Sequence, residues 1–289
     1  LVQDLREETG VDSQWQRCGL LMLSEDQHET IAARAWARLN HVPMDALPPR
    51  EVADKVAGLG LERPEGLWWP EVAQLRNPRL VQALKESLQR KGVTLREGEQ
   101  VKRLLREKDR IVGVETTRER VAAGAVIVAT GAWSKELLSG LEIKLEVEPV
   151  RGQIILYRAD KPLFTPIVGY GDHYLIPRND GHILVGSTVE HAGFDKSTTD
   201  TGRQALEAAA KQVFPALADY PVVHHWAGLR PGSPTGVPII GPHPSVRGLY
   251  LNTGHFRNGL SLAPGSARLL VDLLFDEAAT LDPAPYLPV

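Results

Sequence analysis

The stretch Ala125–Ser134, AVIVATGAWS, decides how the chain folds. An uninterrupted apolar run over 125–129 is typical of a strand buried on both faces of a mainly parallel sheet. The run leads into a turn of small residues at Thr130 and Gly131, and Ser134 stands where it could cap a helix. Glycine lets a ligand approach the backbone, and ligands of open α/β sheets lie outside the carboxyl ends of strands. An ordinary strand-to-helix turn explains the stretch equally well.

The chain before this stretch alternates between helix and strand. Asn77-Pro78 predicts a helix start, with Asn as N-cap and Pro at the first helical position. Apolar residues then recur on one helical face, and Gly92 ends the helix. Further upstream we expect a strand over 19–23 and a short helix over 49–57. The recurring apolar residues are Leu80, Val81, Leu84 and Leu88, and strands are expected at 93–95, 101–105 and 110–115.

After about residue 148 the pattern changes to alternating β segments. The stretches 173–177 and 182–187 flank Arg178-Asn179-Asp180-Gly181, a hairpin turn signal. An amphipathic helix is expected over 201–214. A last strand over 248–252 leads into a final helix, and the pattern leaves open whether that helix begins at Gly259 or at Pro264.

Together these elements predict an α+β protein in which two domains are woven together. A helix–strand layer takes in 72–147 and 241–289, and a mostly antiparallel layer takes in 1–71 and 148–240. No internal repeat or long charge run interrupts the chain.

Bulk properties exclude several classes of protein. The 289 residues are 43% hydrophobic and 24% charged, with a net charge of −3, so neither nucleic acid nor an anionic membrane is expected as a partner. No apolar run approaches the length of a membrane span, and the start LVQDLR does not resemble a signal peptide. The single cysteine, Cys18, fits a reducing compartment, and we expect a cytoplasmic protein.

Two segments carry residues suited to binding a carboxylate. In His173–Arg178, strand alternation puts Tyr174 on the face opposite to Leu175, where its phenol could donate to an anion. In Trp226–Gly232, Arg230 stands among apolar and turn residues, and its guanidinium fork matches a carboxylate. The alternatives are a core tyrosine and a structural arginine paired with an acid brought in by the fold.

A fourth segment, Gly254–Pro264, joins a strand end to a helix start through glycines that bracket a turn. Free backbone N–H groups at a helix start favour negative charge. The histidines at 224, 225, 243 and 255 lack the spacing of zinc ligands, so no metal is expected. No serine elbow or phosphate-binding Walker loop occurs in the sequence.

At these four segments the sequence resembles the D-amino-acid oxidase/glycine oxidase superfamily of flavoenzymes, and within it the bacterial glycine oxidases that serve thiamine biosynthesis. The likeness runs from about Gly19 to the end and is densest in YLIPR (174–178), WAGLRPG (226–232) and GHFRNG (254–259).

The resemblance implies a role for each segment. Arg230 would hold the substrate carboxylate, Tyr174 would be a second donor, and Arg257 would lie near the same anion. The FAD would lie along the turn after the 125–129 strand, its adenine would meet the backbone of Val101, and its pyrimidine edge would face the last helix start. The cofactor-binding residues implied in this way are Val101, Thr130, Gly131, Trp133, Gly254, His255, Asn258, Gly259 and Leu260.

The implied chemistry is hydride transfer from the substrate α-carbon to the flavin, which requires orientation and electrostatics but no dedicated acid or base. The imine would hydrolyse, and dioxygen would reoxidise the flavin to give hydrogen peroxide. Glycine, sarcosine and small D-amino acids all fit as substrates. Cys18 is not where some relatives attach flavin, so FAD would be non-covalent, and an intact enzyme could be a homo-oligomer.

One departure from the family pattern stands out. The family opens with a strand and a G-x-G-x-x-G turn for the FAD pyrophosphate, and the Gly58–Glu62 stretch does not qualify because no buried strand precedes it. We therefore expect a fragment that lacks this N-terminal unit and binds FAD weakly. A related dehydrogenase, or a non-catalytic fragment that binds a carboxylate or a partner through Arg230 and Arg257, remains an alternative.

Overall fold

The computed structural model describes residues 1–24, 27–62, 64–141, 143 and 145–288, and it divides into two compact units. The first unit comprises Leu1–Leu95, Gln153–Thr188 and Ser197–Ala227, and the second comprises Arg96–Gly152, Val189–Lys196 and Gly228–Val289. Residues 72–95 thus pack with the first unit and 228–240 with the second. The functional division expected from the sequence stays a prediction, because packing alone does not say what each part binds.

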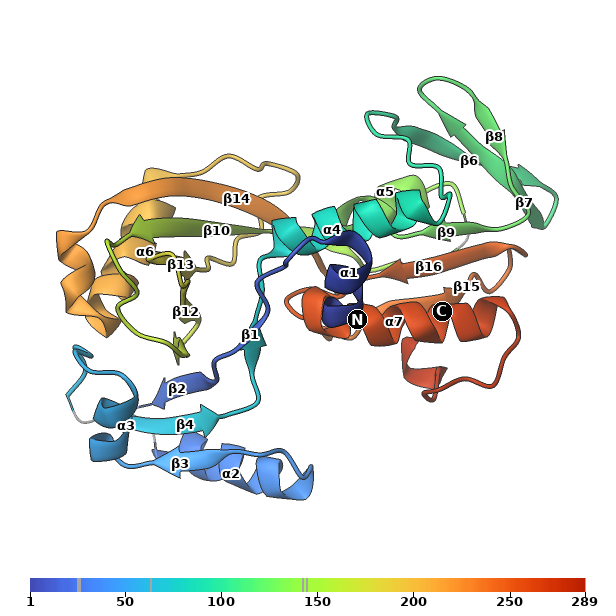
Figure 1. Ribbon diagram of the computed structural model, residues 1–289. Coiled ribbons are helices and arrows are strands. Elements are labelled where there is room, and N and C mark those ends of the chain that lie inside the picture. The colour runs from blue at the N-terminus through green and yellow to red at the C-terminus, as the bar shows by residue number, and fades with distance from the viewer. Residues whose placement is uncertain (25–26, 63, 142, 144, 289) are drawn as a thin grey trace. The chain divides into compact units, whose positions relative to one another are not determined.

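The first unit is built on a large, mostly antiparallel sheet (Figure 1). Strands β10 and β14 run on from this unit into the second. The β12–β13 hairpin expected from the turn at 178–181 is present, whereas β11 and β2 pair in parallel. In sheet order the strands are β14 (Val222–Gly232), β10 (Glu148–Arg158), β13 (His182–Gly186), β12 (His173–Pro177), β11 (Ile167–Tyr170), β2 (Leu20–Ser24), β4 (Glu65–Trp69) and β3 (Asp45–Leu47).

Helix α6 (Asp200–Val213) covers β12 and β13 with the apolar stripe that its sequence predicted. Leu206 and Val213 are fully buried against Leu175 and Ile183 of the sheet, and this cluster is the core of the first unit. The other elements of the unit are α1 (Val2–Thr9), β1 (Gln16–Arg17), α2 (Gln27–Leu39), α3 (Pro49–Lys55), β5 (Ala73–Gln74), α4 (Asn77–Arg90) and the 3-10 turn η2 (Pro215–Asp219). Helix α1 packs against α4.

Polar contacts hold the β12–β13 turn against the segment before α4. Asp180 accepts from Arg76 Nη2 at 2.6 Å and contacts His182 Nδ1 at 2.9 Å. Arg178 Nη1 donates to Gln74 Oε1 at 2.8 Å and to the Leu75 carbonyl at 3.0 Å. Burial opposes ionisation of Asp180, but the hydrogen bonds from His182 and Arg76 outweigh it and lower the pKa of Asp180 to about 2.

This lowered pKa predicts a pH dependence of stability. Because the folded pKa of Asp180, about 2, lies below its ordinary value of 3.8, its contribution is present above about pH 4 and is lost as the pH falls towards 2. Asp180→Asn should therefore lower the melting temperature at pH 6 and have little effect near pH 2, as measured by thermal denaturation. Equal destabilisation at both pH values would show that the charge of Asp180 contributes nothing.

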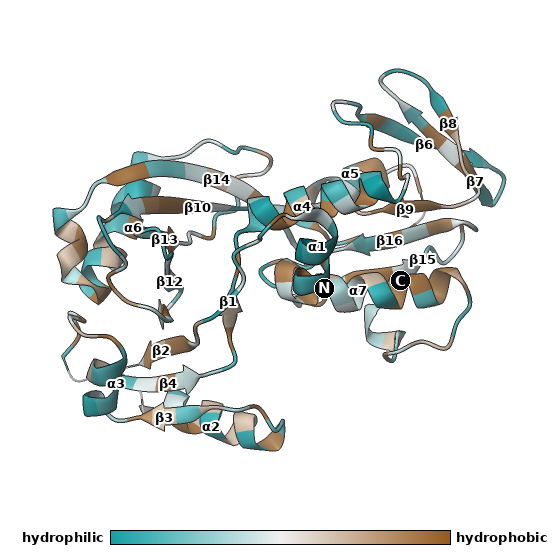
Figure 2. Cartoon of the chain, viewed as in Figure 1, coloured by the Kyte–Doolittle hydropathy of each residue, from teal (hydrophilic) through white to brown (hydrophobic). Residues whose placement is uncertain are grey.

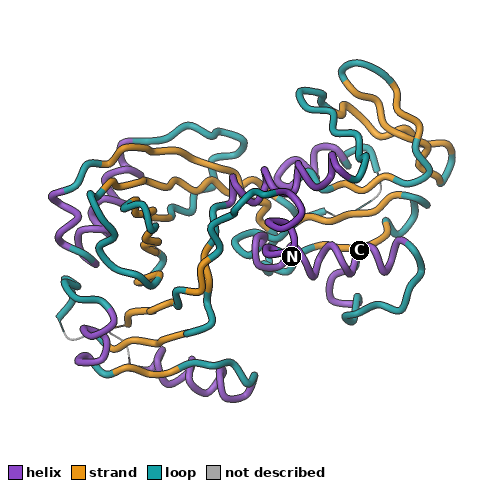
Figure 3. Tube along the Cα trace, in the orientation of Figure 1, coloured by secondary structure: helices purple, strands orange, loops and turns teal. Residues whose placement is uncertain are grey.

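Among the described residues, the second unit has two small sheets and one long helix. Figure 3 draws the strands in orange and the helix in purple. Strands β15 (Ile239–Pro242), β16 (Leu249–Thr253) and β9 (Val126–Val128) form one sheet, in which β16 and β9 are parallel. Strands β6 (Val101–Glu107), β7 (Arg110–Thr116) and β8 (Arg120–Ala122) form the other. Helix α7 (Gly259–Leu274) packs along β15 and β16. The short turns are η1 (Gly131–Trp133), α5 (Ser134–Leu137) and η3 (Ala284–Tyr286).

The α+β class expected from the sequence is confirmed, and the open question about the last helix is settled. Helix α7 begins at Gly259 and contains Pro264 in its second turn. Because proline lacks an N–H group, that turn goes without one backbone hydrogen bond.

Several local predictions are wrong. Asn77 is the first helical residue of α4 and not its N-cap, which is Arg76. The 125–129 strand is not buried on both faces: Val128 is buried, but Ile127 is 45% exposed, because β9 lies at the edge of its sheet within the part of the chain that the structure describes. Residues 93–95 are not a strand. Helix α4 buries Ala83 and Ser87 instead of its leucine face, which is exposed at Leu84 and Leu88, and Figure 2 shows this hydrophobic colour along the helix.

Candidate functional site

A network of hydroxyl groups joins the carboxyl ends of β9 and β16. Ser134 Oγ donates to Thr253 Oγ1 at 2.8 Å and lies 3.1 Å from Thr130 Oγ1. Thr253 Oγ1 donates to the Gly131 carbonyl at 3.1 Å. Since β9 and β16 are parallel neighbours, their ends lie at the same edge of the sheet. Ser134 is therefore not the helix cap that the sequence suggested; its side chain is buried and ties the two turns together.

The turn at the end of β9 is open to a ligand. Gly131 has a φ of 56°, a left-handed conformation that favours glycine, and nothing lies within 4 Å of where a Cβ would be. Thr130 is exposed, and Trp133 is 42% exposed.

The turn between β16 and α7 is also left-handed, with φ values of 78° at Gly254 and 45° at Phe256. Asn258 is the N-cap residue of α7, and its side chain makes no capping hydrogen bond, so the first N–H groups of the helix keep their capacity to donate. Leu260, in the first turn, is exposed. This helix start therefore combines an apolar surface with partial positive charge.

His255 anchors the same turn to the helix. Its Nε2 lies 2.9 Å from Ser266 Oγ, and burial lowers the pKa of His255. Burial favours the neutral imidazole, and the contact with Ser266 ties the turn to α7. The role of His255 in cofactor binding stays a prediction.

Arg230 lies directly over a glycine on the neighbouring strand. A Cβ built on Gly152 of β10 would come within 2.2 Å of Arg230 Nη1 and Nη2 and within 2.4 Å of Cζ. The guanidinium therefore occupies the space that any side chain at residue 152 would fill. Arg230 is half-buried near the end of β14, and the next residue, Pro231, accepts a hydrogen bond from Phe256 N at 3.0 Å. This bond places Arg230 beside the turn that carries Arg257, which is exposed.

In the first unit, Tyr174 has a comparable arrangement with Gly186 of β13. A Cβ at Gly186 would come within 2.6 Å of Tyr174 Oη, and the two residues are directly paired across β12 and β13. Tyr174 is half-buried while Leu175 is fully buried, so the alternation expected from the sequence is confirmed. The role of Tyr174 in binding stays a prediction.

The second unit thus brings together most of the residues singled out from the sequence. The two linked turns and the adjacent strand end carry Thr130, Gly131, Trp133, Arg230, Gly254, His255, Arg257, Asn258, Gly259 and Leu260. Val101 is apart from this group: it begins β6 and pairs with Thr116 in the other sheet. Sequence reasoning missed Gly152 and Thr253. A glycine between Arg151 and Gln153 within a strand was the available signal for Gly152.

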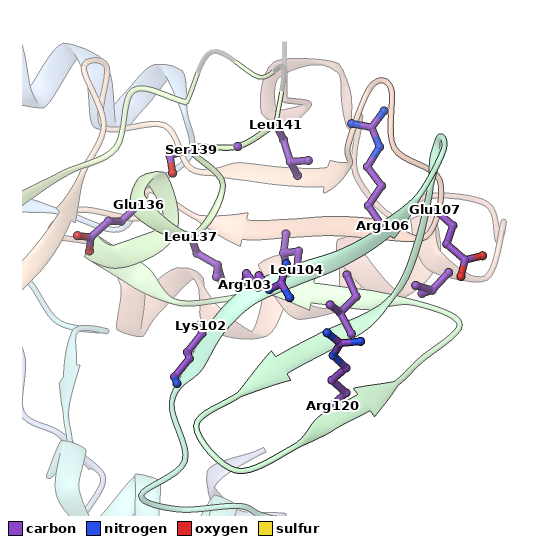
Figure 4. Close-up of a pocket in the computed structure, with 13 residues that line it drawn as sticks. Lys102, Arg103, Leu104, Arg106, Glu107, Arg120, Glu136, Leu137, Ser139 and Leu141 are labelled. Atoms are coloured by element: carbon purple, nitrogen blue, oxygen red, sulfur yellow. The ribbon is translucent and has the colours of Figure 1, made fainter.

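A cavity of about 700 Å³ lies elsewhere in the second unit, between β6 and α5 (Figure 4). Lys102, Arg103, Arg106 and Arg120 contribute to its lining, but in Figure 4 their charged ends point in different directions. Arg103 and Arg120 both pair with Glu115, at 2.7 and 3.2 Å. None of the residues at the strand ends lines this cavity.

Within the described ranges, no group of three or more His, Cys, Asp or Glu side chains is arranged to hold a metal ion. In the same ranges no helix has the length and apolar character that crossing a bilayer requires.

Comparison with known proteins identifies the class. Residues 1–273 match the FAD dependent oxidoreductase (DAO) family. The chain is 47% identical to a protein named glycine oxidase from Pseudomonas aeruginosa, covering 100% of this chain and 79% of that one. It is 34% identical to the bifunctional protein ThiO/ThiG of a Nostoc species, covering 94% of this chain and 42% of that one. Its fold matches the crystal structure of glycine oxidase from Geobacillus kaustophilus with a TM-score of 0.95 at 28% identity, covering 100% of this chain and 79% of that one.

The chain belongs to the FAD dependent oxidoreductase (DAO) family, and it is an enzyme of that family. The resemblance inferred from the four segments is thereby confirmed. The residues at the strand ends fit part of a flavin site, because the open Gly131 turn gives close access to backbone while the α7 start offers N–H donors beside the exposed Leu260.

Proposed function

We propose that the protein catalyses the FAD-dependent oxidative deamination of glycine or another small amino acid, with dioxygen reduced to hydrogen peroxide. The observation that carries this proposal is the position of the Arg230 guanidinium over Gly152, beside the turn that leads into α7. Relatives named glycine oxidase support the choice of substrate. A cytoplasmic, homo-oligomeric enzyme that binds FAD without a covalent bond is part of the same proposal, as is the thiamine-pathway role implied by the resemblance.

Arg230 would bind the substrate carboxylate through two parallel N–H···O bonds, which fix both the position and the plane of the anion. Arg257, exposed on the neighbouring turn, would add a second positive charge. Tyr174 would donate its phenol proton to the same carboxylate. With the carboxylate held, the α-carbon and the amine have few orientations left, which is how such a site lowers an activation barrier.

FAD, when bound, supplies the two-electron acceptor for this reaction. The residues of the chain would position it: the Gly131 turn would accommodate the cofactor against the backbone, and Trp133 would flank it. Gly259 and Leu260 at the start of α7 would face its pyrimidine edge, where N–H groups and the helix dipole stabilise negative charge. Val101 would contact the adenine through its backbone. No side chain is assigned as a general acid or base.

An absorption experiment tests the proposal. The purified protein is mixed with FAD, freed of excess cofactor, and titrated with glycine in the absence of oxygen. We expect flavin bands that bleach with glycine, and hydrogen peroxide in equal amount to the glycine consumed once air is admitted. Bleaching without peroxide would identify a dehydrogenase, and binding of glycine without any flavin would identify a carboxylate-binding protein.

Removal of the Tyr174 hydroxyl tests its proposed contact. A hydrogen bond to a charged group contributes about 1.5–3 kcal/mol, so Tyr174→Phe should lower kcat/KM for glycine by roughly 10- to 100-fold. Tyr157→Phe is the matched control, because the Tyr157 hydroxyl is buried without a hydrogen-bond partner among the described residues. If both variants had the same kcat/KM, Tyr174 would be a packing residue only.

A further inference from the structure

A buried arginine fastens a segment of the second unit that the proposed function does not use. Arg151 Nε and Nη2 donate to Glu190 Oε2 at 3.0 and 2.5 Å, and Nη1 donates to Asp195 Oδ2 at 2.7 Å. The backbones of Arg151 and Glu190 also exchange two hydrogen bonds, of 2.8 and 2.9 Å. The Arg151 side chain is 8% exposed. The segment Val189–Lys196 is thus held by both its backbone and its acids.

The end of this segment lies against Trp133. The rings of Phe194 and Trp133 stack with centroids 5.6 Å apart at an interplanar angle of 30°. Lys196 Nζ lies 5.8 Å from the centroid of the same indole. Asp195 stands between these two residues in the sequence, so its contact with Arg151 constrains both of the neighbours that touch Trp133.

The position of Arg151 on its strand relates this cluster to the carboxylate site. Arg151 and Gly152 are successive residues of β10, so their side-chain positions lie on opposite faces of the strand. Arg230 lies over Gly152 on one face, and Arg151 binds its two acids on the other. The two carboxylates outnumber the single positive charge of Arg151, so Arg151 does not repel Arg230 as an uncompensated cation.

We propose that Arg151, Glu190 and Asp195 are positioning residues that hold Phe194 and Lys196 against Trp133 and thereby fix the indole beside the bound flavin. The flavin part rests on the proposed function, whereas the effect on Trp133 depends on contacts within this chain alone. Trp133 follows the open Gly131 turn and is tied to it through η1, so a change in the segment would be transmitted to the cofactor side of the site.

The geometry explains why an arginine is needed. One planar guanidinium contacts both acids at once, through Nε and Nη2 on one side and Nη1 on the other. A lysine would keep the charge but offers a single donor group that cannot hold two acids in this fixed fork. Arg151→Lys should therefore behave more like Arg151→Met than like the parent protein.

Acrylamide quenching of Trp133 fluorescence is the first test. The signal of Trp133 is obtained by subtracting the spectrum of the same protein carrying Trp133→Phe. In Arg151→Met and Arg151→Lys the Trp133 quenching constant should rise about twofold, because the segment that covers the indole opens locally. Asp195→Asn, which alters a 54% exposed acid and threatens folding least, should give a smaller rise. Trypsin should also cleave faster after Lys196.

Arg103→Met is the matched control. Arg103 donates through Nε and Nη2 to one oxygen of Glu115, at 3.2 and 2.7 Å. Arg151 binds Glu190 with the same two groups, but the Arg103–Glu115 pair is exposed and lies in the sheet of β6, β7 and β8. Removal of Arg103 should leave both Trp133 quenching and cleavage after Lys196 unchanged.

Kinetics of the FAD-loaded enzyme separate positioning from mere stability. With the carboxylate still held by Arg230, Arg151→Met should lower kcat for glycine by about tenfold or more while KM changes less than about threefold. Quenching and kcat like those of Arg103→Met, with or without a lower melting temperature, would overturn the proposal. A change in Trp133 quenching in a protein that fails to oxidise glycine would support the positioning role and count against the proposed function instead.

Discussion

Replacing Arg230 with methionine should lower kcat/KM for glycine by about 30-fold to a few thousand-fold. Loss of one partner from a hydrogen-bonded charge pair costs about 2–5 kcal/mol, and each 1.4 kcal/mol is a factor of ten. Methionine keeps much of the side-chain length, so packing against β10 changes little. The measurement is steady-state oxidation of glycine, with peroxide as the readout.

Two comparisons make this result specific. An amine without a carboxylate should be oxidised by Arg230→Met and by the parent protein at similar rates, because it has no anion for Arg230 to bind. Arg247→Met, which removes an exposed arginine paired with Asp109 at 3.0 Å, should leave glycine oxidation unchanged. If the carboxylate-free amine lost as much activity as glycine, Arg230 would act on the fold or on the cofactor and not on the substrate.

Gly152→Ala should have an effect of similar kind without touching the arginine. The added Cβ would lie 2.2 Å from Arg230 Nη1, so the guanidinium has to leave its position. The backbone of β10 can accept alanine, and the atom that moves is the end of a flexible side chain, so the protein should still fold. Misplacement of a positioning group by about 1 Å can cost about 10²-fold, and we expect kcat/KM for glycine to fall by roughly that factor.

The double variant distinguishes this explanation from general damage to the strand. If Gly152→Ala acts through Arg230, then Gly152→Ala combined with Arg230→Met should be no worse than Arg230→Met alone, since coupled positions are not additive. Gly140→Ala is the control, because nothing lies within 4 Å of the Cβ it would gain. Additive losses in the double variant would mean that Gly152 contributes something other than room for Arg230.

The sequence predicts those features of the fold that depend on local pattern. The helix that starts at Asn77-Pro78, the β12–β13 hairpin around 178–181 and the amphipathic α6 follow from the position of a proline, turn chemistry and periodicity, and all three are present. The cap of the first helix was not predicted correctly, because Arg76 is the N-cap residue and no side chain caps it. The segments at Gly131 and Gly254 stand out in the sequence because glycine admits a ligand close to the backbone and brackets a turn, and both residues have positive φ values. The binding roles of the residues beside them follow from the family resemblance alone.

The sequence could not predict what depends on neighbours that are distant along the chain. The apolar run 125–129 has the composition of a fully buried strand, but exposure depends on which elements pair with it, and β9 has β16 on one side only among the described residues. The leucines of α4 recur at helical spacing, as predicted. However, α1 packs on a different face of the helix, where Ala83 and Ser87 are buried. Gly152 makes room for Arg230 of β14, and Arg151 binds acids of the 189–196 segment. Both roles depend on segments that lie beside β10 in the fold but are distant from it in the sequence.

The interior proline of α7 has a consequence for the thermodynamics of cofactor binding. Beyond Pro264 the helix is anchored by Ser266, Leu269 and Leu270, which are buried. Because Pro264 in the second turn donates no backbone hydrogen bond, the helix is held less firmly before it, at its exposed first turn. That turn can therefore lose and regain its order at little free-energy cost, independently of the rest of the helix. A ligand that binds to this turn must also order it. The measured free energy of binding is therefore less favourable than the contacts alone would give, by the entropic cost of that ordering.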